Sequence, residues 1–407
     1  MSENREKAKA AMNKPASFGV DLDLSEYSRP ATVTEPCPVS TFSREVLDRA
    51  LRVGVDANAK DRSGTYFQSD RSVVLQSVHE ALQGKVEIMS TPDAIKKYDW
   101  LKDYWWRIVP VDADKYTAIA ELEWDKGYFI RVLRGQKLTL PIQSCLLISQ
   151  NNLDQNVHNV IIAEPNSEAQ IITGCTIHPN VRRGLHVGIS EFYVKENAKL
   201  TFTMIHSWGE GIDVRPRSAA IVENNAIFIS NYLCTSPVKT LQTYPAAYCR
   251  GNRSRAIFNT ILYGRKDSKL DVGSKIVLQG KDSAGEVMSR AIADENSEIY
   301  ARGMLVGENR RSRAHLECRG LLLSRSASVH AIPELVARAE GTELSHEAAV
   351  GKISEEQIEY LMARGLSEPE ATSLIVTGFM DVEVFGLPGI LKGEIKRAIS
   401  LTAERAI

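Results

Sequence analysis

Residues 266–347 read KDSKLDVGSKIVLQG, KDSAGEVMSRAIAD, ENSEIYARGMLVGEN, RRSRAHLECRGLLLS, RSASVHAIPELVARA and EGTELSHE when the chain is divided before each polar turn. Most segments begin with a charged or polar pair and a small residue, and apolar positions then follow in rough alternation. The second residue of each segment follows that of the previous segment by 15, 14, 15, 15 and 15 residues. These residues are Asp267, Asp282, Asn296, Arg311, Ser326 and Gly341. A fixed step of this kind is typical of a repeat protein.

The same step appears doubled farther upstream. Asn166, Asn197 and Asn224 follow similar turns at separations of 31 and 27 residues. The pattern predicts a flattened parallel β-helix, in which each coil has two strands and about 30 residues and stacks on the next through backbone hydrogen bonds. Roughly seven coils fit, giving a rod about 34 Å long. The alternative is an antiparallel sandwich, with turns every ~8–12 residues and hairpin dipeptides such as Asn-Gly, and neither signal stands out.

The β-rich segment covers residues 115–346, between two regions of helical pattern. Residues 1–40 are polar and aperiodic, which predicts a flexible N-terminal arm. Residues 41–114 predict a helical region, with helical apolar spacing at 41–53 and 73–82 and an aromatic helix at 101–109 that packs on the larger body.

Residues 347–407 predict a C-terminal helical region. Ser354 and Ser367 each precede Gln or Glu by three residues, a capping-box pattern, and Gly365 ends the first helix. A further helix is expected at 391–404. The apolar linker at 379–389 either packs on the protein itself or forms a groove for a partner.

Bulk properties exclude several classes of function. The net charge of −1 gives no general attraction for nucleic acid or an anionic membrane. No apolar stretch approaches the ~18–20 residues that span a bilayer, and the first residues lack the apolar core of a secretory signal. We therefore expect a cytoplasmic protein with neither nucleic acid nor membrane as a partner.

Common catalytic and metal-binding motifs are also absent from the sequence. The six cysteines, at 37, 145, 175, 234, 249 and 318, form no C-x-x-C pair, which argues against a zinc ribbon or a ferredoxin loop. In a reducing compartment we expect them to be mostly free thiols. No phosphate-binding loop, dinucleotide fingerprint, HExxH or GxSxG occurs. A carbohydrate enzyme on a β-helix remains a remote alternative, because carboxylate clusters and hexapeptide repeats are not seen.

One candidate site involves Cys318, which lies in the alternating segment HLECRGLLLS. Cys318 and Glu347 are 29 residues apart, close to one coil, which predicts that they lie on adjacent coils about 5 Å apart. His346 is next to Glu347, whereas His315 is expected on the opposite face from Cys318. A thiolate, an imidazole and a carboxylate can hold iron or a persulfide. The simpler interpretation is coincidence, because any two residues 29 apart stack in such a repeat.

A second candidate is the group Cys175, His178 and His186, in TGCTIHPNVRRGLHV. Mixed Cys and His ligands suit a metal or a path for sulfur. Cys175 and His178 would face opposite sides of an unbroken strand, but Pro179 is expected to end the strand there. The simpler interpretation is a buried cysteine with loop histidines.

At these residues the sequence resembles the SufB/SufD family of iron–sulfur cluster assembly proteins. The resemblance is carried by HLECRGLLLSRSASVHAIPEL and ELSHEAAVGKISEEQIEYLMARGLSEPEATSLIVTGF, and upstream by IITGCTIHP and LHVGISEFYVKENAKLTFTMIHSWGEG. It covers roughly residues 115–407 and implies a right-handed parallel β-helix core between helical ends. It also implies a scaffold without its own ATPase activity.

The resemblance further implies partners and roles. The partners are an ABC-type ATPase, SufC, on the C-terminal helices, a sulfur-donor desulfurase system and cluster carrier proteins. Cys318 is similar to the scaffold cysteine of SufB and acts as sulfur acceptor, Glu347 is similar to a SufB glutamate, and Cys175 and His186 are similar to positions on the sulfur route. Iron and a nascent cluster of unspecified type are implied, with Cys318, Glu347 and His346 as ligands.

Features of both branches occur together, since LLLSRSASV is similar to SufD. The combination predicts a homodimer through the β-helix, with two Cys318 residues facing across a two-fold axis. Some complexes of the family bind reduced flavin, but this sequence carries no flavin signal, and it lacks the N-terminal cysteine motif of typical SufB. The alternative is a non-catalytic SufD-like structural partner of a separate SufB.

Overall fold

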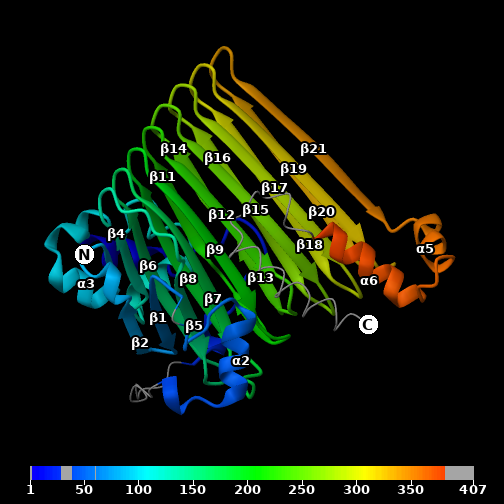
Figure 1. The fold of residues 1–407 in the computed structure, drawn as a ribbon, viewed down its shortest axis with the longest axis horizontal. Helices are drawn as coiled ribbons and strands as arrows, with labels where there is room; N and C mark the ends of the chain where they lie inside the picture. Colours follow the sequence, from blue (N-terminus) through cyan, green and yellow to red (C-terminus); the bar gives the residue numbers. More distant parts are fainter. Residues whose placement is uncertain (1, 29–38, 60, 381–407) are drawn as a thin grey trace.

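The computed structural model describes residues 2–28, 39–59 and 61–380, and its main body is a stack of mostly parallel strands (Figure 1). One sheet, here called the first sheet, contains β1 (Gly64–Ser69), β2 (Ser72–Val78), β5 (Ile142–Ile148), β7 (Glu168–Ile177), β9 (Lys199–Ser207), β12 (Ile227–Cys234), β15 (Arg255–Gly264), β17 (Ala284–Ala293), β19 (Arg313–Leu322) and β21 (Glu343–Lys352). The second sheet contains β3 (Val86–Ser90), β4 (Tyr128–Val132), β6 (Asp154–Ala163), β8 (Gly184–Val194), β10 (Ile212–Val214), β11 (Arg217–Val222), β13 (Thr240–Thr243), β14 (Ala246–Cys249), β16 (Lys269–Leu278), β18 (Glu298–Gly307) and β20 (Ser328–Ala337). The helices are α1 (Ser2–Ala11), α2 (Arg44–Arg52), α3 (Thr91–Lys97), α4 (Lys115–Leu122), α5 (Glu355–Met362) and α6 (Glu368–Phe379).

The two sheets are the two faces of a parallel β-solenoid. From β5 onward the chain alternates between the sheets, and each strand pairs in parallel with the strand one turn earlier, as in β17 with β15. The stack has about eight turns, one more than the sequence indicated. The predicted β-helix is therefore confirmed, and the antiparallel sandwich is wrong.

The turns explain the repeat seen in the sequence. Asn166, Asn197 and Asn225 have φ values of 61°, 57° and 55°, the left-handed conformation that asparagine tolerates better than most residues. The side-chain amide of Asn197 donates to Asn166 Oδ1, and that of Asn225 to Asn197 Oδ1, both at 3.0 Å. Asn225 rather than Asn224 therefore continues the ladder, and turn-to-turn separations are 28 to 31 residues.

Apolar ladders fill the space between the sheets. Side chains alternate in direction along a strand, so every second residue points inward. Leu270 of β16 and Ile299 of β18 are register partners and both are buried in this interior. Burying a Leu or Ile side chain contributes about 1.5–3 kcal/mol, which is the main stabilisation of a solenoid whose turns contact only their neighbours.

The first residues are packed rather than loosely ordered. Ala8 and Ala11 of α1 are buried in a cluster that also contains Tyr116 and Ile119 of α4. Farther along, the Tyr27 hydroxyl donates to Asp213 Oδ2 at 2.6 Å. The expected flexible arm is therefore wrong for residues 2–28, because these apolar and hydroxyl groups find partners on the body, and residues 29–38 lie outside the described range.

Residues 41–114 are only partly helical. Helices α2 and α3 form, but β1, β2 and β3 lie between and beside them, and the expected helix at 73–82 is mainly strand β2. The error has a physical cause: β1 and β2 form an antiparallel hairpin that extends the first sheet, and this pairing overrides local apolar spacing. Helix α4 also forms inside the segment predicted as β-helix.

The aromatic segment packs on the second sheet around a buried carboxylate. Glu191 of β8 accepts the backbone N–H groups of Trp106 at 2.8 Å, Ile108 at 2.7 Å and Val109 at 3.2 Å, and its Oε2 lies 2.9 Å from His158 Nε2. The expected packing is thus observed, but after a short 3₁₀ turn (Asp99–Asp103) the chain is irregular rather than helical.

The C-terminal helices follow the last strand. Glu370 Oε2 accepts the backbone N–H of Ser367 at 2.8 Å, which confirms the second capping box, whereas the Ser354 side chain makes no capping hydrogen bond. Helix α6 packs through Val376 on the outer face of the first sheet. The expected helix at 391–404 and most of the linker at 379–389 lie outside the described residues. Within the described chain, no helix has the length and apolar character needed to cross a bilayer.

Candidate functional site

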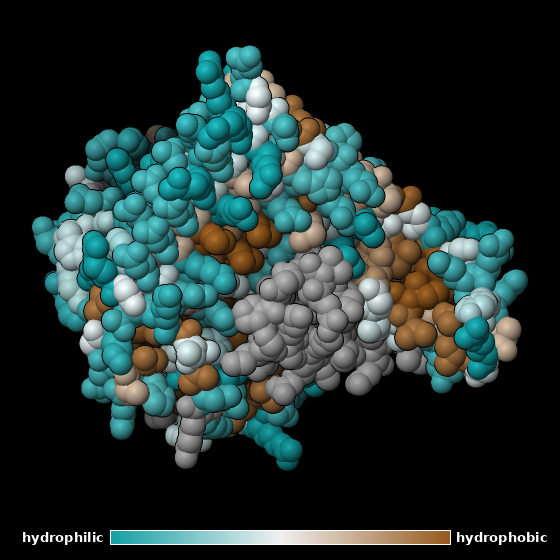
Figure 2. Space-filling model, turned by 45° about the horizontal axis from the view of Figure 1, so that its top comes forward, coloured by the Kyte–Doolittle hydropathy of each residue, from teal (hydrophilic) through white to brown (hydrophobic). Residues whose placement is uncertain are grey.

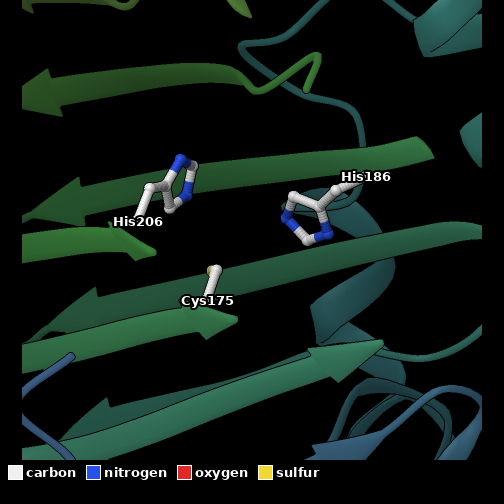
Figure 3. A group of neighbouring side chains, drawn as sticks. All are labelled: Cys175, His186 and His206. Atoms are coloured by element: carbon white, nitrogen blue, oxygen red, sulfur yellow. The ribbon is translucent and has the colours of Figure 1, made fainter. Parts of the chain in front are cut away.

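Three metal-ligating side chains meet between the two sheets (Figure 3). One ligand atom of each of Cys175, His186 and His206 lies within 4.8 Å of the others, and all three residues are buried. Cys175 on β7 and His206 on β9 are direct register partners, and His186 belongs to β8 in the opposite sheet. The solenoid itself, rather than a loop, therefore assembles this site.

Hydrogen bonds fix the orientation of His186. Its Nδ1 lies 2.9 Å from Gln155 Oε1, and Gln155 Nε2 donates to the carbonyl groups of Asp70 and Leu147. Since the Gln155 oxygen must then accept, His186 Nδ1 carries the proton and Nε2 keeps its lone pair. Gly188 permits this position, because a Cβ there would lie 3.0 Å from Nε2.

The second histidine has an unsatisfied ring nitrogen. His206 Nδ1 lies 2.8 Å from the Tyr232 hydroxyl, but its buried Nε2 has no hydrogen-bond partner among the residues that the structure describes. The ring of Trp208 lies 5.2 Å from that of His206, and no described residue hydrogen-bonds to its buried indole Nε1. An unpaired buried polar atom costs about 1–3 kcal/mol, so a ligand that satisfies it is favoured.

Burial keeps the site uncharged. It lowers the pKa of His186 to about 3. It also lowers the pKa of His206 well below its usual value, with the nearby His186 as a second cause. Burial raises the pKa of the Cys175 thiol. A neutral thiol and two neutral imidazoles suit a soft or borderline metal, whose binding displaces the thiol proton, or a sulfur species.

The predicted group is only partly assembled. Cys175 and His186 come together as expected, but His178 is not in the cluster, and its Nδ1 accepts the N–H of Asn180 at 3.2 Å. His206 takes its place and was missed by the sequence argument. His206 follows Cys175 by 31 residues, the same step that separates Asn166 from Asn197 on the same turn, so the repeat contained the signal.

A second thiol continues the same interior row. Cys234 of β12 is the register partner of His206 on the next turn, so His206 stands between Cys175 and Cys234. Burial raises the pKa of the Cys234 thiol to about 12. The five cysteines that the structure describes, Cys145, Cys175, Cys234, Cys249 and Cys318, are all buried and free, and Cys37 lies outside the described residues.

Cys318 and Glu347 lie on adjacent turns, as predicted, but the expected side-by-side placement of their side chains is wrong. The register partner of Cys318 is Ala348, and Glu347 pairs with Glu317. The turn here contains 30 residues instead of 29, and a shift of one residue moves a side chain to the other face of the strand. Cys318 is 2% exposed in the interior, whereas Glu347 continues the outward-facing row of Glu317 in a last strand that is exposed on both faces.

His346 is better placed than Glu347. It pairs with Leu316, which faces the interior as Cys318 does, so His346 and Cys318 share a face on adjacent turns. His315 lies on the opposite face as expected, where its Nδ1 is 2.9 Å from Ser345 Oγ. Burial, and secondly the charge of Glu317, raise the pKa of the Cys318 thiol to about 11.

Fold and site together define a class of protein: a parallel β-solenoid that encloses a buried group of one thiol and two imidazoles. Residues 146–379 match the family model described as SUF system FeS cluster assembly, SufBD core domain. The chain belongs to the SufB/SufD family of iron–sulfur cluster assembly proteins.

Relatives extend the similarity over nearly the whole chain. An iron–sulfur cluster assembly SufBD family protein of Methanothermobacter thermautotrophicus (strain Winter) is 46% identical over 402 residues, covering 97% of each chain. A SufBD family protein of Archaeoglobus fulgidus is 49% identical over 358 residues, 88% of this chain and 95% of its own. The iron–sulfur cluster assembly protein SufB of Bacillus subtilis is 28% identical over 403 residues, 96% of this chain and 86% of its own.

Proposed function

We propose that this chain is a scaffold on which iron–sulfur clusters are assembled in a SUF-type complex. It accepts sulfur and iron as substrates. The ATPase SufC controls when the assembly site is exposed, and the finished cluster passes to carrier proteins. The observation that carries the proposal is the group of Cys175, His186 and His206, which offers one thiol and two imidazoles buried between the sheets.

The first step is acceptance of sulfur at Cys175. A donor persulfide transfers its outer sulfur to the thiol, so that R–S–S⁻ and Cys175–SH become R–SH and Cys175–S–S⁻. The S–S bond of the donor breaks, a new one forms on Cys175, and the thiol proton passes to the donor sulfur. The unpaired Nε2 of His206 stands beside the product and can hold its terminal sulfur.

A row of hydroxyl groups leads from this site toward Cys318. Tyr232, which bonds His206, is followed on successive turns by Thr260, Ser289 and Cys318 as register partners. Tyr232 and Thr260 also line an internal cavity of about 40 Å³. Cys175 and Cys318 are five strands apart, about 24 Å, and this row supplies polar contacts over that distance. Cys318 is the proposed cluster-building thiol.

Iron is held at the end of this row. Cys318 and His346 lie on the same face of adjacent strands, although His346 is itself exposed in the last turn. One thiolate with one imidazole leaves open positions for sulfide or for ligands from a second chain. Glu347 faces away and is not part of this ligand set.

The second chain docks at the open end of the solenoid. Leu335 and Val350 are 36% and 43% exposed, although their register partners are the interior residues Leu305 and Gly320. β20 and β21 each pair with one neighbour among the described strands. An end that no described residue covers, with apolar side chains and free strand edges, favours association, and a two-fold homodimer covers both copies at once.

SufC docks on the C-terminal helices. Tyr360, Met362 and Leu374 of α5 and α6 are 57%, 44% and 54% exposed. Figure 2 shows hydrophobic surface at this end of the molecule.

Arg290 Nη1 donates to the carbonyl of Phe379 at 2.6 Å, which ties α6 to the first sheet. Movement of the helices by the ATPase is thereby linked to strand β17, two turns from the open end. A buried thiol reacts slowly until it is exposed, so such movement controls reaction at Cys318.

Reconstitution with SufC, a desulfurase, cysteine and ferrous iron tests the proposal. Cys175→Ser and Cys318→Ala are expected to abolish the thiolate-to-iron absorption of the assembled cluster while dimerisation and SufC binding persist. Cys249→Ser is the matched control, since Cys249 is equally buried but belongs to the second sheet outside the ligand group. Normal cluster yield from Cys318→Ala removes that thiol from the mechanism.

A SufD-like structural role is the second candidate. It is favoured by one observation, the enclosure of Cys318 without the carboxylate partner expected beside it. If this chain with SufC alone builds no cluster, but does so when a separate SufB is added, the structural role is correct.

A further inference from the structure

We propose that the outer face of the first sheet carries a binding site for a small phosphate ester, with the phosphate group held between Arg255 and Arg313. The site is a groove of about 770 Å³ at the start of strands β15, β17, β19 and β21, which lie side by side (Figure 1). A groove of this volume suits a small molecule. It is separate from the buried thiols, because Arg313 is exposed on the outer face of β19 whereas Cys318 on the same strand is buried in the interior.

The two arginines stand on either side of an alanine. Arg255, Ala284 and Arg313 are register partners on three successive strands, β15, β17 and β19. Neighbouring strands are about 4.8 Å apart, so the Cα atoms of the two arginines are about 10 Å apart. Because the alanine side chain is short, both guanidinium groups can reach a single ligand that lies above it.

Neither guanidinium group is already neutralised. Earlier in the same row of register partners, Lys199 forms an ion pair with Glu168 at 3.2 Å. The register partners of Arg255 are both uncharged. Within the part of the chain that the structure describes, neither Arg255 nor Arg313 takes part in an ion pair or a side-chain hydrogen bond. Two exposed cations are thus left for a ligand.

The turns beside the groove are strongly basic. Residues 250–255 and 310–313 each contain three arginines and no carboxylate, although the formal net charge of the chain is −1. Two ion pairs join these turns to their neighbours, Arg311 with Asp282 at 2.7 Å and Arg310 with Glu340 at 3.9 Å. Positive charge along a groove raises the local concentration of anions.

A phosphate monoester fits this pair of arginines better than a carboxylate. A guanidinium group binds an oxyanion through two parallel hydrogen bonds. A phosphate monoester has three terminal oxygens and a charge of about −1.5 to −2 at pH 7, which is close to the opposite of two arginines. It therefore contacts both guanidinium groups at once, whereas the two oxygens of a carboxylate are occupied by one.

The rest of the lining selects the part of the ligand that carries the phosphate. Glu286 and Glu343, the register partner of Arg313, form no ion pair with any described residue. His315, whose Nδ1 lies 2.9 Å from Ser345 Oγ, is also in the lining. The two carboxylates accept hydrogen bonds from hydroxyl or amino groups and repel a second anionic group. The ligand is therefore a compact ester of one phosphate with a sugar or nucleoside, rather than a polyanion.

Calorimetric titration of the full-length protein with adenosine monophosphate, ribose 5-phosphate and inorganic phosphate tests this site. Both esters are expected to bind, and inorganic phosphate about tenfold more weakly, because it makes no contact with the carboxylates. Binding of the nucleotide alone identifies a nucleoside phosphate, and binding of both esters identifies recognition of phosphate and sugar hydroxyl groups. If neither ester binds, or if inorganic phosphate binds as tightly as both, the assignment is overturned.

Four single substitutions locate the binding. Ala284→Glu is expected to abolish it, because a carboxylate between the arginines pairs with both. Arg255→Ala and Arg313→Ala are each expected to weaken it by about tenfold. Arg338→Ala is the matched control, since Arg338 lies on the same edge but pairs with Glu308 at 2.9 Å and does not line the groove. Unchanged affinity in Ala284→Glu, or an equal loss in Arg338→Ala, contradicts the site.

A short single-stranded oligonucleotide separates a small ligand from a polymeric one. It is expected to bind more weakly than adenosine monophosphate, because its further phosphates meet the two carboxylates of the groove. Tighter binding of the oligonucleotide, in competition with the nucleotide and steeply reduced by salt, would make this edge a nucleic-acid surface and overturn the small-ligand assignment.

Discussion

Cys175 and His206 are direct register partners on adjacent strands of the first sheet, with both side chains in the interior of the solenoid. Their alignment follows from the 31-residue length of one turn, which the asparagine ladder sets at the edge of the stack. A metal-ligating pair is thus produced by the same register that stacks the core, and His186 completes it from the opposite sheet.

Cobalt(II) is expected to bind the purified protein with a thiolate-to-metal absorption band. The buried thiol and imidazoles offer a mixed sulfur and nitrogen ligand set, which tetrahedral divalent metals favour. Cys175→Ser should remove the band and His206→Ala should weaken binding, with absorption titration as the measurement. Cys249→Ser should bind as the wild type does; loss of the band in this control would place the metal elsewhere.

Stability of the metal-free protein is expected to fall as the pH drops below about 6.5. Burial lowers the pKa of His186 to about 3, so the unfolded state takes up a proton first and gains stability relative to the folded state. Between the pKa of His186 in the unfolded state and its pKa in the folded state, the free energy of unfolding falls by at most about 1.4 kcal/mol per pH unit. His206, whose pKa is also lowered, adds in the same direction.

Urea unfolding at pH 7.5, 6 and 5 in the presence of a chelator measures this slope. His186→Gln is expected to flatten it, because the glutamine has no proton to take up. The same slope in the variant and the wild type would show that other groups cause the pH dependence.

Glu191→Gln is expected to destabilise the protein by about 2–4 kcal/mol. The amide NH₂ group of glutamine is itself a donor, so it cannot accept the backbone N–H groups that the carboxylate accepts. Glu191 accepts the backbone N–H groups of Trp106, Ile108 and Val109 and faces His158. Denaturant unfolding monitored by tryptophan fluorescence gives the value.

Glu223→Gln is the matched control. Glu223 pairs with Lys195 at 3.0 Å but its side chain is 38% exposed, and an exposed pair contributes about 0–1 kcal/mol. Equal losses in the two variants would mean that the buried carboxylate has no special role in holding the aromatic segment.

Leu335→Glu and Val350→Glu are expected to convert the proposed dimer to a monomer. Each places a charge on an interior position that is left open in the last turn, where a second copy would have to bury it. Light scattering coupled to size-exclusion chromatography measures the mass. A wild-type protein that is monomeric at micromolar concentration contradicts the homodimer.

Leu374→Glu is expected to weaken SufC binding at least tenfold, roughly 1.4 kcal/mol, while the unfolding midpoint stays near that of the wild type. The side chain is 54% exposed, so the charge costs little in the free protein but would be buried under a partner. Calorimetric titration measures the affinity. Leu335→Glu serves as the control at the other surface, and a similar loss there would argue that SufC binds the open end.

The fold could be predicted because its signal is local and repeated. Polar turns such as the one at Asp282 recur at a nearly constant step, and alternation between turns predicts strands. Where this repetition is missing the prediction failed: the apolar spacing in residues 73–82 suggested a helix, but pairing with β1 makes most of the segment a strand.

The sequence by itself predicted the family and the solenoid, and it placed Cys175 and His186 in one candidate group, together with His178, which lies outside the cluster. Only the tertiary structure decided that His206 completes the group and that Glu347 faces away from Cys318. The reason is that turn lengths vary between 28 and 31 residues. A difference of one residue exchanges the inner and outer faces of a strand, so the identity of two neighbours depends on the exact length of every turn between them.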